Sequence, residues 1–117
     1  MKIKTSLAAA AVFGALGCAT VQVPSEKFEQ SQASIRSAEE LGADTVPAAK
    51  LHLQLAKDQE DQAKKLAANG DGNAVLLLAR ANSDAELALA LAREAATNKD
   101  AGKAAEDLKA VQARPSP

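Results

Sequence analysis

Apolar and polar positions follow helical spacing along most of the chain after residue 24. The clearest pattern lies in residues 73–98, where small apolar residues recur at alternating steps of four and three: Ala74, Leu78, Ala81, Ala85, Ala88, Ala92 and Ala95. This heptad spacing is typical of a helix that packs against another helix. Because Ala is small, the two helix axes can approach to the lower end of the range of about 8–10 Å. The sequence therefore predicts a helix here with a buried Ala seam.

Two further helices are predicted before it, over residues 25–41 and 47–68. On the first, one face carries Phe28, Ile35, Ala38 and Leu41. On the second, one face carries Ala49, His52, Ala56, Gln59, Ala63 and Leu66. Gly42 and Pro47 mark the first break, and the run from Asn69 to Asn73 marks the second, since Gly ends helices while Pro, Asp and Asn begin them.

These helices predict an all-α fold, either an antiparallel helical hairpin or a three-helix bundle. Folding the last two helices back on each other would set Leu51, Leu53 and Leu55 near a second leucine cluster at Leu87, Leu89 and Leu91. We assign residues 25–98 to the helical domain and residues 99–117 to a frayed or disordered tail. Most apolar residues are Ala and only two residues are aromatic, so a wide core or a deep cavity is not expected.

The N-terminus has the organisation of an export signal. Lys2 and Lys4 form a short positive region, and residues 7–17 form an uncharged apolar stretch of 11 residues. As a helix this stretch would span about 16 Å, which is too short for a bilayer core of about 30 Å. Residues 1–17 are therefore predicted to be a signal peptide, followed by a tether at 18–24.

Cys18 follows this segment directly, and Ala15-Leu16-Gly17-Cys18 resembles a lipobox, the motif at which bacterial lipoproteins are acylated and cleaved. The resemblance implies that Cys18 carries the lipid. An ordinary signal peptide with an unmodified Cys is the alternative. Ala19 takes the position that directs sorting in Gram-negative lipoproteins, where Asp favours the inner membrane. Ala19 therefore implies the outer membrane.

The composition of the chain argues against several classes of function. The chain has a net charge of −1 and one His, and it has no basic cluster with interleaved aromatics, so nucleic-acid binding is not expected. No set of ligands for a metal, no phosphate-binding loop and no nucleophile motif is evident. We therefore expect no enzyme activity, no cofactor and no small-molecule substrate.

Two polar features of residues 47–68 need interpretation. His52 lies on the apolar face, where it is either a pH-sensitive ligand contact or, more commonly, a partly buried ring bonded to a neighbour. The carboxylates of Asp58, Glu60 and Asp61 spread around one helix, so we interpret them as solvated charges. Glu60–Lys64 and Asp61–Lys65 have the spacing of stabilising ion pairs.

Three stretches, at residues 33–43, 47–53 and 76–95, resemble a bacterial lipoprotein family known as domain of unknown function 4398. That domain precedes an OmpA-like domain in some proteins, but no such domain follows here, so peptidoglycan binding is not implied. The family brings no catalytic residues to this chain.

The sequence thus predicts a lipid-anchored periplasmic module at the outer membrane that acts structurally or binds an envelope protein or itself. The alternative is a helical-repeat-like adaptor that binds peptides or envelope proteins in a groove between helices.

Overall fold

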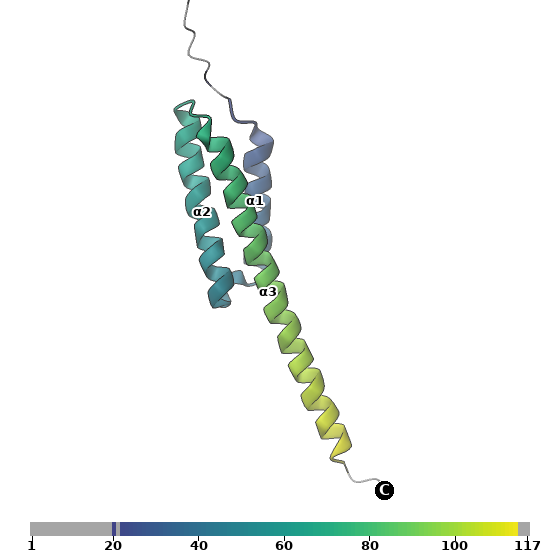
Figure 1. Ribbon diagram of the computed structural model, residues 1–117. Helices are drawn as coiled ribbons and strands as arrows, with labels where there is room; N and C mark the ends of the chain where they lie inside the picture. The colour runs from purple at the N-terminus through teal and green to yellow at the C-terminus, as the bar shows by residue number, and fades with distance from the viewer. Residues whose placement is uncertain (1–19, 21, 115–117) are drawn as a thin grey trace, which may run out of the picture.

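The computed structural model describes residues 20 and 22–114, and every regular element in this part of the chain is helical (Figure 1). Helix α1 spans Ser25–Glu40, the short 3-10 helix η1 spans Ala43–Thr45, α2 spans Pro47–Ala68 and α3 spans Asn73–Gln112. The predicted all-α fold is confirmed. Because α1 packs against α3 as well as α2 against α3, the arrangement is a three-helix bundle.

The turns form where Gly and Asp were expected to form them. Gly42 follows α1 with a positive φ of 78°, and Gly70 follows α2 with a φ of 71°. This left-handed backbone lets the amide of Asp71 donate to the carbonyl of Leu66 at 3.0 Å, which closes α2. The Asp71 carboxylate then accepts the backbone N–H of Asn73 at 2.9 Å and so satisfies a free donor at the start of α3.

The core is built largely from Ala. Six positions of the predicted seam on α3 are buried, namely Ala74, Leu78, Ala81, Ala85, Ala88 and Ala92, while Ala95 is half-buried. Buried Ala49, Ala56 and Ala63 lie on α2, and Ala38 lies on α1. These small side chains allow the helices to approach closely, which confirms the packing predicted for α3.

The buried face of α2 is rotated from the predicted one. Leu53 and Glu60 are buried together with the three Ala residues, whereas His52 and Gln59 are only half-buried. The reason is that α2 must face α1 as well as α3. On α1, Ser31 is buried in place of Leu41, which is exposed.

The two predicted leucine clusters are each divided between the core and the surface. Leu53 is buried, and Leu89 and Leu91 pack against the core, but Leu51, Leu55 and Leu87 are exposed. Residues two apart on a helix point in very different directions, so three alternating leucines cannot share one face.

Helix α3 also extends beyond its predicted end near residue 98 and reaches Gln112. Residues 93–112, which we call the arm, continue past the ends of α1 and α2 for about 30 Å (Figure 1). Residues 99–112 are helical and all of them are exposed, so they do not form a disordered tail, while the predicted fraying stays a prediction. Ala, Lys, Glu and Leu favour helix without a packing partner, which accounts for the extension.

Candidate functional site

The predicted lipidation residue Cys18, the sorting residue Ala19 and the signal peptide 1–17 lie outside the described residues. Thr20, however, is described, and it lies against the turn between α2 and α3. A Cβ atom added to Gly70 would stand 2.9 Å from Cγ2 of Thr20. The chain therefore enters the bundle at the end with the α2–α3 turn, and the arm leaves from the opposite end (Figure 1).

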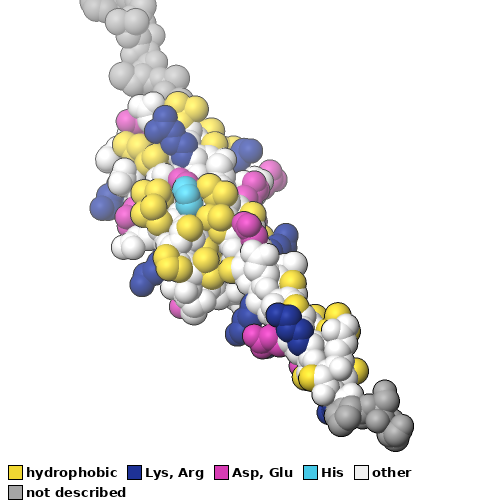
Figure 2. Space-filling model, turned by 60° about the horizontal axis from the view of Figure 1, so that its bottom comes forward, with side chains coloured by type: hydrophobic (Ala, Val, Ile, Leu, Met, Phe, Trp, Pro, Cys, Tyr) yellow, Lys and Arg dark blue, Asp and Glu magenta, His cyan; other side chains and the backbone are white. Residues whose placement is uncertain are grey.

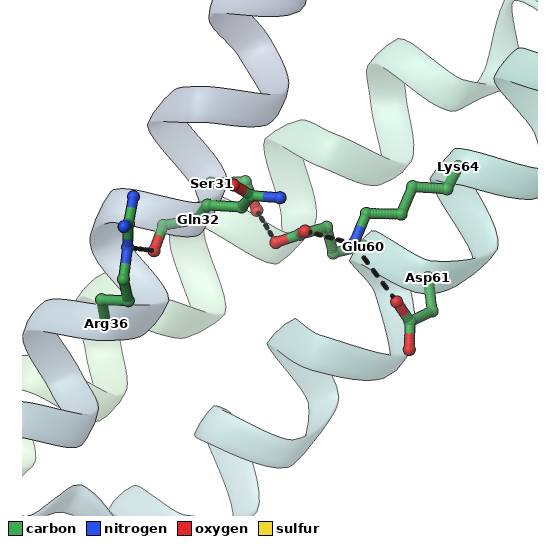
Figure 3. A network of polar contacts seen from close by, with 6 residues as sticks. All are labelled: Ser31, Gln32, Arg36, Glu60, Asp61 and Lys64. Carbon is green, nitrogen blue, oxygen red and sulfur yellow. Dashed lines mark hydrogen bonds and ion pairs between the residues drawn. The ribbon is translucent and has the colours of Figure 1, made fainter.

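A groove runs between α1 and α2, because these two helices contact each other less than either contacts α3. The groove has a volume of about 330 Å³. Both helices contribute to its lining, which consists of Gln32, Ile35, Arg36, Lys57, Glu60, Asp61 and Lys64. Figure 3 shows Ser31 of α1 and Glu60 of α2 meeting between the two helices, while Arg36 lies along α1.

Glu60 is the most buried charge of the groove, with 4% of its surface exposed. Its carboxylate accepts a hydrogen bond from the Ser31 hydroxyl at 3.2 Å and pairs with the Lys64 ammonium at 2.8 Å (Figure 3). The interpretation of Glu60 as a solvated charge is therefore wrong, while its predicted pairing with Lys64 is confirmed. Its spacing of four from Ala56 and three from Ala63 was the signal for its burial.

Lys64 connects Glu60 to a second carboxylate, since its ammonium also lies 3.4 Å from Asp61. It takes the place predicted for Lys65 in pairing with Asp61. The hydrogen bond to Glu60 and the negative charge of both carboxylates raise the pKa of Lys64 above its ordinary value, although partial burial acts in the opposite direction.

The rims of the groove carry charges that are already paired. The Arg36 side chain donates to the backbone carbonyl of Gln32 at 3.4 Å, and Lys57 forms an ion pair with Glu39. Along α2, basic and acidic side chains of the lining follow one another in the order Lys57, Glu60, Asp61 and Lys64.

The opposite side of the α2–α3 pair holds a second polar cluster. Nδ1 of His52 lies 2.9 Å from one carboxylate oxygen of Asp84, and the amide of Gln59 donates to the other oxygen at 2.8 Å. A carboxylate accepts, so the proton of this contact belongs to His52. The expectation of a partly buried, hydrogen-bonded ring is confirmed.

Exposed leucines surround this cluster. Leu51 and Leu55 of α2 and Leu87 of α3 are 59%, 39% and 43% exposed, and we call these three residues the leucine face. Figure 2 shows the single histidine of the chain among hydrophobic side chains on this surface. Contiguous apolar side chains around a polar centre are typical of protein-interaction surfaces.

Within the described residues, no group of three His, Cys, Asp or Glu side chains gathers at the spacing of a metal site. In the same part of the chain, no helix is long and apolar enough to cross a bilayer. No family model, no curated protein and no solved structure matches this chain. The resemblance to domain of unknown function 4398 therefore stays a prediction.

Proposed function

We propose that this protein is a lipoprotein of the domain of unknown function 4398 type, anchored through Cys18 at the periplasmic face of the outer membrane. It acts there as a structural or protein-interaction module without catalysis. The lipobox-like sequence before Cys18 and the Ala at position 19 support the anchor and the sorting.

The lipobox-like sequence that ends at Cys18 carries this proposal, and the placement of Thr20 against the α2–α3 turn supports an orientation for the anchored bundle. Cys18 precedes Thr20 by two residues, which span at most about 7 Å. A lipid on Cys18 would thus hold the turn end of the bundle at the bilayer. The arm would then point away from the membrane.

The chemistry suits a durable attachment. The Cys18 thiolate would attack the glyceryl carbon of a phospholipid, so that a thioether forms as the carbon–oxygen bond to the phosphorylated head group breaks and the head group leaves. Hydrolysis of the Gly17–Cys18 peptide bond then frees an amine, which can take a further acyl chain from a lipid ester as the lyso lipid leaves. Each buried methylene contributes about 0.8 kcal/mol. Two or more chains therefore retain a small domain at the membrane, where a single chain binds only reversibly.

The leucine face is the surface that we assign to an envelope-protein partner. Docking would cover Leu51, Leu55 and Leu87 and bury apolar area that now faces water. Each square ångström of apolar area removed from water contributes about 25 cal/mol. The second candidate is the adaptor function, which the polar groove between α1 and α2 favours.

Mass spectrometry of the mature N-terminus tests the anchor. We expect a chain that begins at Cys18 and carries the mass of a diacylglycerol with or without an additional acyl group. Cys18→Ser should abolish both the acylation and the cleavage before residue 18. A free thiol at Cys18 in protein isolated from membranes contradicts the proposal.

Ala19→Asp tests the sorting. In a Gram-negative host, this variant should move from the outer to the inner membrane fraction of a density gradient, while the lipid mass stays the same. Ala19→Ser is the matched control and should stay in the outer membrane. Unchanged fractionation of Ala19→Asp contradicts the outer-membrane assignment.

Charge substitutions distinguish the two partner surfaces. Leu87→Lys should reduce recovery of a co-purified envelope protein at least tenfold, while Arg36→Glu should leave recovery unchanged. Both residues are exposed, so both variants should fold. The reverse pattern would assign the partner to the groove and support the adaptor function instead.

A further inference from the structure

The arm has an exposed apolar stripe of its own. Ala101, Ala104, Leu108 and Val111 recur at steps of three and four on α3, and Leu108 and Val111 are 59% and 61% exposed. The stripe lies on a different face from the bundle seam. If the seam spacing is continued into the arm, it meets polar residues and Gly instead, at Lys99, Gly102, Glu106 and Lys109.

We propose that the arms of two copies of this protein pair side by side in a parallel, two-stranded coiled coil along this stripe. The inference rests on the proposed lipid anchor. Two copies held in one membrane by their turn ends direct their arms the same way, so the stripes can meet only in parallel.

The charges beside the stripe favour the same orientation. In a parallel pair, the residue before the first core position of each heptad, here Ala101 and Leu108, faces the position five residues further along the partner helix. Asp100 would then face Ala105, and Asp107 would face Gln112. In an antiparallel pair, Asp100 of each copy would face Asp107 of the other, and like charges at these positions destabilise a coiled coil.

The stripe also limits the length of the pairing. Toward the bundle, the stripe continues through Thr97, and the next position with the same spacing is Glu94. In a parallel pair, Glu94 of one copy would face Glu94 of the other, and the two negative charges would repel. Pairing therefore covers about residues 97–111. So short an interface lies below the roughly 1,000 Å² expected of a stable complex.

Confinement in the membrane compensates for the small area. Tethering two copies to one surface raises their effective concentration without any new contact. We therefore expect pairs on the membrane and monomers in dilute detergent.

Disulfide cross-linking in the envelope tests this pairing, because Cys18 is the only natural cysteine. The full chain with Leu108→Cys is produced in a Gram-negative host, as tagged and untagged copies in the same cells. Like residues of a parallel pair lie within the distance range of a disulfide, with Cα atoms about 4.4–6.8 Å apart. Mild oxidation should therefore convert Leu108→Cys into dimers that contain one tagged and one untagged copy.

Glu106→Cys is the matched control, because residue 106 is also exposed on the arm but lies away from the stripe. It should give at most one tenth of the dimer. Dimers at equal yield from both variants, no dimer from Leu108→Cys, or an adduct with a different protein overturns the inference.

Mass spectrometry of Cys18 in the same samples separates this inference from the proposed function. Lipidated protein without Leu108→Cys dimers overturns the pairing and leaves the anchor intact. Dimers from Leu108→Cys with a free Cys18 thiol overturn the anchor and support the pairing on its own. Unlipidated protein without dimers overturns both.

Discussion

The two halves of α3 belong to one continuous helix, but they are stabilised in different ways. From Ala74 to Ala92, the seam is buried against α1 and α2. In the arm, every residue from Ala96 to Gln112 is exposed, so the helix there is held by its backbone hydrogen bonds and by helix propensity. Isolated helices of about this length are marginal in water.

The difference shows what determines where a bundle ends. The helix does not stop at the bundle boundary, because no Gly with a positive φ and no Pro interrupts it there. The packing of α3 ends where its antiparallel neighbour α2 begins, at Pro47, because no helix lies beside α3 beyond that point. In addition, the seam positions of α3 change there from Ala to Lys and Glu. Secondary structure and tertiary packing therefore end at different residues.

Overpacking the seam should have the largest effect and should be confined to the bundle half. Ala88 is fully buried, so Ala88→Leu forces extra methyl groups into a fitted contact between helices. Such changes cost about 1–3 kcal/mol. Circular-dichroism melts of the bundle should show a lower midpoint, or light scattering should show a new oligomeric state.

Ala90→Leu is the control, because Ala90 lies on the exposed side of the same half of α3. It should melt within about 0.5 kcal/mol of the natural protein. If Ala88→Leu melts normally, or if Ala90→Leu is the more damaging change, the seam does not hold the bundle together.

Removing a charge should also affect the bundle and the arm differently. Lys64→Met leaves the buried Glu60 carboxylate with only the Ser31 hydroxyl as a partner. We expect a loss of about 1–2 kcal/mol, less than for a fully buried pair because Lys64 is itself half-exposed. Lys103→Met, an equivalent change on the arm, should leave the denaturant midpoint of the bundle unchanged.

The pH dependence of this difference follows from the raised pKa of Lys64. The ion pair stabilises the folded protein while Lys64 is charged, so its contribution is complete below the pKa of an unfolded lysine, about 10.4. It is lost as the pH rises through the higher pKa of the folded state. The natural protein and Lys64→Met should therefore converge in stability above that range, and a constant difference would contradict the role of the ion pair.

A glycine substitution should have a smaller effect, this time in the arm alone. A Cβ on Gly102 would have no atom within 4 Å, so Gly102→Ala should stabilise the local helix by about 1 kcal/mol. Amide exchange of the arm should slow by about fivefold to tenfold, while the melting midpoint of the bundle stays the same. The same change at Gly70 should destabilise the protein, because Gly70 has a positive φ and Thr20 occupies the space.

The starts of all three helices could be predicted from sequence, because local chemistry marks them. Pro24 precedes α1, Pro47 opens α2, and Asp71 caps α3 at Asn73. The Ala seam was equally clear because its spacing is regular. These signals act over a few residues, so they need no knowledge of tertiary structure.

Features that depend on how the three helices pack together could not be predicted in the same way. The rotation of α2 follows from the position of α1, which no local pattern reveals, although the spacing of Glu60 from Ala56 and Ala63 did indicate that Glu60 is buried. The packed helix was predicted to end near residue 98, although helix-forming residues continue to Gln112. The roles of Cys18 and Ala19 stay predictions.

Residue-resolved hydrogen exchange on the purified chain in dilute detergent tests most directly whether packing or propensity holds each half of α3. Amides from residues 74 to 92 should exchange only when the bundle unfolds, whereas those from 97 to 112 should exchange through local fraying, at least about a hundredfold faster. Protection should fall within one or two turns of Ala92. Uniform protection from Asn73 to Gln112 would contradict the division of α3 into a packed half and a free arm.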